Sequence, residues 1–150
     1  MFEPGHLTDR NPPFRFAAYT RVAFSDTDAQ DVVYYGRYLP YFDLARTEYH
    51  RHVGDEGAPR AEFVMRASSV EYFAPARFDD LLEVFVRVSR IGRASVTYDY
   101  AAHRVTPADD DLLLVTASQT LVLIDHADRR TLAVPDSFRT CISKFEGVAL

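Results

Sequence analysis

The chain of 150 residues has one cysteine, one lysine and no tryptophan. Because Cys141 is the single cysteine, an internal disulfide and a metal cluster held by several cysteines are excluded, and a reducing compartment is favoured. No nucleophile motif surrounds Cys141, so we interpret it as a packing residue. The five histidines show no metal-ligand spacing, and we expect no metal site.

Long apolar runs and runs of basic residues are also missing. No window approaches the roughly 20 apolar residues of a membrane-spanning helix, and the first residues lack the basic and apolar regions of a signal peptide. The 22 acidic residues are interleaved with 17 basic ones, giving a net charge of -5 without a stripe that could follow phosphates. We therefore predict a cytoplasmic protein that binds neither membranes nor nucleic acid.

The chain does contain enough apolar material for one folded domain, since 47% of its residues are hydrophobic. Pro4, Pro12 and Pro13 interrupt backbone hydrogen bonding near the N-terminus, so we expect an extended tail over residues 1–15. Residues 16–150 are predicted to form a single domain.

One amphipathic helix is predicted over residues 37–53. Proline is tolerated in a first helical turn, where Pro40 lies, and Gly54 is a typical helix stop. Apolar residues recur at steps of three and four, at Tyr38, Phe42, Ala45, Tyr49 and Val53. Charged residues are predicted to occupy the remaining helix surface, at Asp43, Arg46, Glu48 and Arg51.

Five segments have the composition of strands. One precedes the helix and four follow it, at Ala17–Ser25, Glu62–Phe73, Leu81–Ile91, Ala94–Val105 and Leu112–Ile124. Apolar residues at the even positions from Leu82 to Val88 alternate with Glu83, Phe85, Arg87 and Ser89, which predicts a half-buried antiparallel strand. Gly92 and Arg93 are typical of a hairpin turn.

This order predicts an α+β fold in which a long central helix is wrapped by a curved antiparallel sheet of about five strands. One helix cannot cover both faces of such a sheet, so apolar surface is left for another subunit. We expect a homodimer that pairs into a homotetramer.

An acidic turn, Asp26-Thr27-Asp28, lies between the first strand and the helix. The N–H groups of a first helical turn have no intrahelical acceptor, so they can stabilise a developing negative charge while a nearby carboxylate attacks or activates water. Asp28 is the candidate for that carboxylate, whereas Asp26 is better interpreted as a cap or turn acceptor.

These residues resemble the acyl-CoA thioesterases of the hot-dog fold, of the 4-hydroxybenzoyl-CoA thioesterase type. The resemblance covers the chain from near Arg15 onward. It rests on Asp26-Thr27-Asp28-Ala29, Val32-Val33-Tyr34-Tyr35, Tyr38 with Phe42–Arg46, Phe73–Leu81, the hairpin Arg90–Ser95 and Val134-Pro135.

The resemblance implies hydrolysis of an acyl-CoA thioester to a carboxylic acid and CoA, with no separate cofactor. It implies that Asp28 is the nucleophile or general base and that the Tyr35 backbone N–H polarises the thioester carbonyl. Either role suits a carboxylate, because a thioester carbonyl is weakly resonance-stabilised and a thiolate is a fair leaving group. Further substrate contacts are predicted for Asp31, Val33, Gly36, Tyr38, Asp43 and Arg93.

Asp31 is the main departure from the family, which usually has glycine at this position. Glycine permits a positive φ and close approach to a ligand, whereas aspartate adds a side chain that could narrow the pocket. Aspartate is among the few residues that tolerate the left-handed region, so we expect the turn to survive.

Other functions use similar acidic turns or the same fold. A module that binds an acyl thioester without cleaving it stays open, as does a dehydratase or hydratase, although no histidine lies between Asp26 and Tyr49. A calcium loop starting at Asp26 would need glycine and glutamate where Asp31 and Arg37 stand. A phosphatase with an Asp-x-Asp motif would need parallel βα units, a downstream lysine and a longer chain, whereas here Lys144 is the single lysine and the predicted strands follow one another directly.

Overall fold

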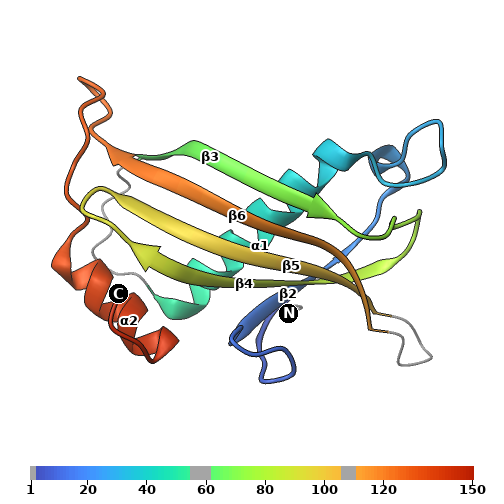
Figure 1. Ribbon diagram of the computed structural model, residues 1–150, viewed down its shortest axis with the longest axis horizontal. Coiled ribbons are helices and arrows are strands. Elements are labelled where there is room, and N and C mark those ends of the chain that lie inside the picture. Colours follow the sequence, from blue (N-terminus) through green and yellow to red (C-terminus); the bar gives the residue numbers. More distant parts are fainter. Residues whose placement is uncertain (1–2, 55–61, 106–110) are drawn as a thin grey trace.

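The computed structural model describes residues 3–54, 62–105 and 111–150, which form one antiparallel sheet crossed by a long helix (Figure 1). The strands are β1 (Gly5–Leu7), β2 (Phe16–Arg21), β3 (Glu62–Tyr72), β4 (Leu81–Ile91), β5 (Ser95–Val105) and β6 (Leu112–Ile124). The helices are α1 (Tyr38–Val53) and α2 (Asp136–Glu146), and two short 3-10 helices are η1 (Phe24–Asp26) and η2 (Tyr35–Arg37). The strand order is β1-β2-β4-β5-β6-β3.

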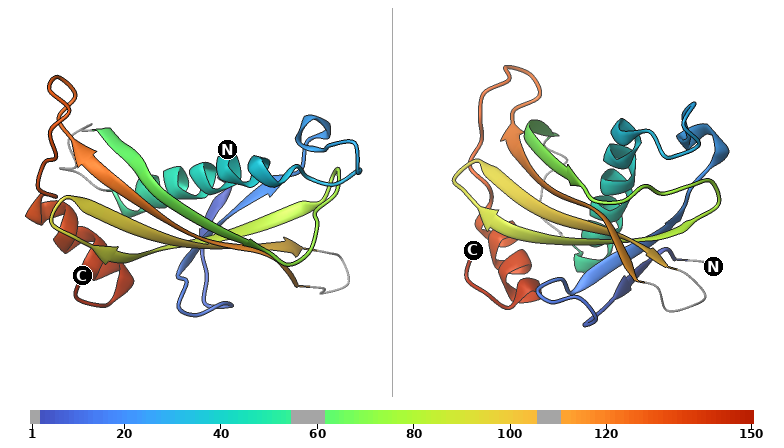
Figure 2. Two further views of the ribbon diagram at one scale, coloured as in Figure 1. Left: turned by 45° about the horizontal axis from the view of Figure 1, so that its top comes forward. Right: turned by 45° about the vertical axis from the view of Figure 1, so that its right-hand side comes forward.

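The α+β arrangement predicted from the sequence is confirmed. Figure 2 shows α1 lying along one face of the twisted sheet, where it contacts β1, β2 and β4 and stacks Phe42 on Tyr100 of β5. Its buried residues follow the predicted stripe, at Tyr38, Phe42, Ala45 and Tyr49. Gly54 ends the helix with a φ of 67° and donates its N–H to the His50 carbonyl at 3.0 Å.

The sheet has a sixth strand because the N-terminal segment joins it. Gly5–Leu7, within the expected tail, pairs antiparallel with β2, and Tyr19 N–H donates to the Pro4 carbonyl at 2.9 Å. Pro12 and Pro13 lie in the loop between β1 and β2, where no ladder bond is needed.

The N-terminal segment also covers the outer face of the sheet, which changes the burial predicted for β4. Glu83 and Phe85 were predicted to face solvent, but they are 1% and 0% exposed. Glu83 pairs with Arg10 and is 3.2 Å from the His6 Nε2, and Phe85 packs against Phe14. The half-burial prediction was therefore wrong on this face, because the chain supplies its own cover.

One strand boundary, the burial of one residue and one additional helix also differ from the sequence prediction. The first strand ends at Arg21 rather than Ser25, since Phe24–Asp26 turns into η1. Glu48, predicted on the helix surface, is 9% exposed because β1 packs against α1 there. Helix α2 was not predicted, since its buried apolar residues, Phe138 and Ile142, amount to a single four-residue step.

Within the described residues, no helix has the length and apolarity needed to cross a membrane. The strand β3 forms one edge of the sheet, and residues 65–69 on it are exposed. The main core lies between α1 and the inner face of the sheet, with the rings of Phe42 and Tyr100 stacked at 4.7 Å.

Candidate functional site

The acidic turn is closed by its own backbone hydrogen bonds. Asp28 N–H donates to the Val32 carbonyl at 2.9 Å, and Asp31 N–H donates to the Asp28 carbonyl at 3.0 Å. Val33 N–H donates to the Ala76 carbonyl at 2.8 Å, which attaches the turn to the segment after β3. Asp31 has a φ of 62°, in the left-handed region that aspartate tolerates, and the turn is formed as expected.

Asp26 is the buried acid of the turn, and its carboxylate accepts three hydrogen bonds. It is 9% exposed, and its carboxylate accepts from Ala23 N–H at 2.9 Å, from Arg37 Nε at 2.8 Å and from the Tyr41 hydroxyl at 2.7 Å. Burial opposes ionisation, but the hydrogen bonds and the Arg37 charge outweigh it, and the pKa of Asp26 lies below its ordinary value. Burial, and next the Asp26 carboxylate, raise the pKa of Tyr41 above its ordinary value. The expectation that Asp26 is a turn acceptor is confirmed.

Asp28 is the more exposed acid of the turn, and its carboxylate accepts fewer hydrogen bonds than that of Asp26. Its Oδ1 accepts one hydrogen bond, from Gln30 N–H at 2.8 Å, in the pattern of an Asx turn. The side chain is partly exposed and borders a cavity of about 510 Å³. A carboxylate with so few partners keeps lone pairs available for water or for an electrophile.

The cavity is mostly apolar, with one carboxylate on its wall. Its lining comes from the acidic turn, the start of the helical segment and the end of β3, namely Asp28, Gln30, Val32, Val33, Tyr35, Tyr38, Tyr72, Phe73, Ala74 and Pro75. An apolar pocket with few polar groups is typical of a small-molecule site.

The helical segment begins at this cavity. Tyr35 opens η2, which leads directly into α1, and Arg37 N–H donates to the Tyr34 carbonyl at 2.8 Å. In the described part of the chain, the Tyr35 N–H has no hydrogen-bond acceptor. Such an amide at the start of a helical segment can receive a negatively charged oxygen.

The structure brings together some of the predicted site residues. Asp28, Tyr35, Val33 and Tyr38 border the cavity, and Gly36 follows Tyr35 without belonging to the lining.

Asp31, Asp43 and Arg93 do not line this cavity. Asp31 is exposed, and Asp43 is exposed and pairs with Arg46 at 2.7 Å. Arg93 lies in the β4–β5 hairpin, at the opposite end of the sheet from the acidic turn (Figure 1). Within one chain, therefore, Arg93 is remote from Asp28.

One wall of the cavity, formed by Tyr72, Phe73, Ala74 and Pro75, was not predicted from the sequence to belong to the site. The sequence feature that could have indicated this wall is a pair of aromatic residues at the end of a strand, two positions before a proline. That signal is weak, because aromatic residues at a strand end are as often core residues as pocket residues.

Comparisons with known proteins identify relatives of this chain. A family model described as the thioesterase superfamily matches residues 30–109. The chain is 36% identical over 121 residues to the acyl-CoA thioester hydrolase YbgC of Escherichia coli O6:H1, covering 78% of this chain and 87% of that protein.

Solved structures show the same fold. A thioesterase superfamily protein from Jannaschia sp. CCS1 matches with a TM-score of 0.81 and 21% identity, over 92% of this chain and 87% of that one. A 4-hydroxybenzoyl-CoA thioesterase variant in complex with 4-hydroxybenzoyl-CoA matches with a TM-score of 0.75 and 22% identity, over 85% of this chain and 97% of that one.

Proposed function

Because this chain belongs to the thioesterase superfamily, we propose that it hydrolyses an acyl-CoA thioester with Asp28 as the reacting carboxylate and the Tyr35 N–H as the oxyanion donor. One observation carries the assignment of these residues: Asp28 and the first residue of the helical segment border the same cavity. A carboxylate and an amide donor on one apolar pocket are the two parts that thioester cleavage requires.

The acyl group would lie against the apolar wall, with its carbonyl carbon near the Asp28 carboxylate. In one route, the carboxylate attacks this carbon, the CoA thiolate leaves, and water hydrolyses the mixed anhydride. In the other route, Asp28 takes a proton from the attacking water. In both, the carbonyl oxygen becomes negatively charged, and loss of one donor to such an oxygen typically lowers the rate about a hundredfold or more.

The test is release of free thiol from a panel of aliphatic and aromatic acyl-CoAs by wild type and Asp28→Asn. The variant is nearly isosteric but non-basic, so we expect kcat to fall by about a thousandfold or more on every substrate that wild type cleaves. Equal rates for the two proteins would show that the assignment of Asp28 is wrong. We expect the best substrates to carry an aromatic or branched acyl group, since Tyr38, Tyr72 and Phe73 line the cavity.

Two alternative functions receive less support from the site. The binding-module hypothesis rested on Asp31, which is exposed and not part of the cavity lining. A dehydratase of this fold would use a histidine, and the described lining of the cavity contains none. Tight acyl-CoA binding in calorimetry without thiol release would favour the binding module. An absorbance change with crotonyl-CoA would favour the dehydratase.

The free edge of β3 supports assembly into a homodimer. β3 is the last strand of the described sheet, and Met65 and Phe73 on this side are 45% and 56% exposed. We propose that two copies join along this edge, that dimers pair into a homotetramer, and that Arg93 contacts CoA only in the site of another subunit. Light scattering should give a multiple of the 17.1 kDa chain mass, and a monomer would contradict the proposal. The cytoplasm is the proposed compartment, in keeping with the lone cysteine.

A further inference from the structure

Tyr72, at the end of β3, is connected to the residue that supplies the proposed oxyanion donor. Its hydroxyl donates a hydrogen bond to the Tyr35 carbonyl oxygen at 2.9 Å. Its ring also makes edge contacts with Tyr35 and Tyr38, at centroid distances of 6.3 and 5.9 Å. Tyr72 therefore joins the β3 wall of the cavity to the start of the helical segment.

Tyr35 lies between two peptide groups, and one hydrogen bond holds each of them. The group that carries the Tyr35 N–H is held through the Tyr34 carbonyl, which accepts from Arg37 N–H at 2.8 Å. The next group is held through the Tyr35 carbonyl by Tyr72. The Tyr35 N–H lies in the first of these planes, and the second plane is joined to it through φ and ψ of Tyr35, so the bond from Tyr72 restrains the backbone on the C-terminal side of the donor.

Core packing does little to hold this residue. Tyr35 is 62% exposed, and its ring contacts Tyr34 and Tyr72, which are 47% and 49% exposed. Rings this open to solvent bury little area, so they contribute little to the rigidity of the backbone. Among the described residues, the hydrogen bond from Tyr72 is therefore the one that reaches the η2 backbone from a strand of the sheet.

We propose that Tyr72 is a positioning residue for hydrolysis: its hydroxyl holds the Tyr35 peptide so that the Tyr35 N–H is aimed at the thioester carbonyl oxygen. This inference rests on the proposed function of the Tyr35 N–H. It adds that a side chain from the β3 wall of the cavity restrains the residue that carries the donor. A small misplacement of a group that acts in the transition state is enough to reduce a rate.

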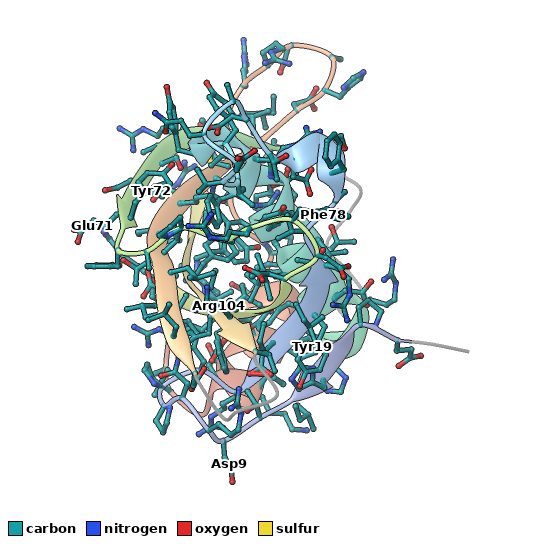
Figure 3. All side chains as sticks on the ribbon, turned by 90° about the vertical axis from the view of Figure 1, so that its right-hand side faces the viewer. Asp9, Tyr19, Glu71, Tyr72, Phe78 and Arg104 are labelled. Atoms are coloured by element: carbon teal, nitrogen blue, oxygen red, sulfur yellow. The ribbon has the colours of Figure 1, made fainter. Side chains whose placement is uncertain are left out.

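The test compares Tyr72→Phe with wild type and with Tyr19→Phe. Tyr72→Phe keeps the ring on the cavity wall and removes only the hydroxyl. Tyr19 is a partly exposed tyrosine on β2, and three strands separate β2 from β3 in the sheet. Figure 3 shows the two labelled tyrosines on different sides of the molecule. The control therefore removes a hydroxyl of the same kind from outside the cavity.

For Tyr72→Phe we expect kcat to fall about tenfold with KM within about twofold of wild type, because the donor is misdirected in the transition state while ground-state contacts stay. We expect Tyr19→Phe to keep the wild-type kcat. The dissociation constant of an S-alkyl-CoA thioether, which has no carbonyl to polarise, should be unchanged in Tyr72→Phe. Thermal melting of each variant checks that it is folded.

A wild-type kcat for Tyr72→Phe would overturn the proposal. A rise in KM at unchanged kcat would also overturn it, since Tyr72 would then be a substrate contact. Asp28→Asn, assayed in parallel, separates this outcome from failure of the proposed function. If Asp28→Asn is inactive while Tyr72→Phe has wild-type kcat, the function stands and the positioning role fails. If Asp28→Asn is fully active, the assignment of the acid fails, and the kcat of Tyr72→Phe still decides the role of Tyr72.

Discussion

Asp26 and Asp28 lie two residues apart, yet the two sides of the acidic turn have opposite properties. Asp26 is buried and accepts three hydrogen bonds, one of them from a guanidinium, whereas Asp28 is partly exposed and accepts one. A carboxylate whose lone pairs are occupied holds a structure together, and one with free lone pairs on a cavity can react. The turn thus separates a structural acid from a reactive acid within three residues.

Asp26→Asn should cause the largest loss of stability among changes to this turn. The asparagine side chain has one acceptor atom where three donors converge, so at least one donor loses its partner. We expect the free energy of unfolding to fall by about 2 kcal/mol and the melting temperature by about 6 °C. Chemical denaturation of wild type and variant at neutral pH measures this difference. A loss below about 0.5 kcal/mol would contradict the structural role of Asp26.

The same pair of proteins should show a pH dependence of definite sign. The pKa of Asp26 is lower in the folded chain than its ordinary value of 3.8. The stability that ionised Asp26 contributes is therefore present above the unfolded pKa and is lost as the pH falls through the folded pKa. We expect the stability difference between wild type and Asp26→Asn to shrink when denaturation is repeated at about pH 3. A difference that grows in acid would contradict the assigned cause.

Glu146 is a second buried acid to compare with Asp26, because its pKa is raised whereas that of Asp26 is lowered. Its Oε2 accepts from the Tyr49 hydroxyl at 2.7 Å and from Val88 N–H at 3.0 Å, but burial outweighs both bonds and raises the pKa of Glu146 above its ordinary value of 4.5. Its contribution is present below the unfolded pKa and is lost as the pH rises through the folded pKa. Since glutamine keeps an acceptor oxygen, we expect Glu146→Gln to cost less than about 1 kcal/mol at neutral pH. A cost as large as that of Asp26→Asn would contradict this account.

Tyr41→Phe, which changes a hydrogen-bond partner of Asp26, is expected to cause an intermediate loss of stability. The substitution removes one donor from Asp26 and leaves the bonds from Ala23 and Arg37 in place. We expect a loss of about 1 kcal/mol in unfolding free energy and little change in kcat. If kcat instead fell as far as in Asp28→Asn, the separation of the two acids would not hold.

Asp31→Gly should have the smallest effect. Glycine adopts the φ of 62° without strain, which stabilises the folded chain. It also raises the conformational entropy of the unfolded chain, which lowers stability, so the two contributions to the free energy of unfolding oppose each other. We expect a stability change within about 0.5 kcal/mol and a change of less than about twofold in kcat/KM, since the Asp31 side chain does not line the cavity. A larger change in kcat/KM that differs between acyl-CoA substrates would show that Asp31 contributes to specificity.

Much of the fold could be predicted because its signals are local and repeated. The apolar stripe of α1 and the alternation in the strands each extend over many residues, so chance patterns are unlikely to imitate them. The covering of Glu83 by the N-terminal segment could not be predicted, because it depends on contacts between residues that are far apart in sequence. For the same reason the pairing of Tyr72 with Tyr35 was not visible before the structure.

The site was predictable to the extent that one continuous segment forms it. Asp28, Val33, Tyr35 and Tyr38 all belong to the turn and the start of the helical segment, and all four border the cavity. Arg93 was assigned from resemblance, and the sequence gives no means of knowing that its hairpin lies at the other end of the sheet.

The central claim, that Asp28 reacts while Asp26 supports the turn, is tested most directly by measuring kcat and melting temperature for Asp28→Asn and Asp26→Asn together. We expect Asp28→Asn to lose about a thousandfold or more in kcat with a melting temperature within about 2 °C of wild type. We expect Asp26→Asn to melt about 6 °C lower and, at a temperature where it is folded, to lose less than about tenfold in kcat. Wild-type turnover by Asp28→Asn, or equal losses of turnover in both variants, would contradict the claim.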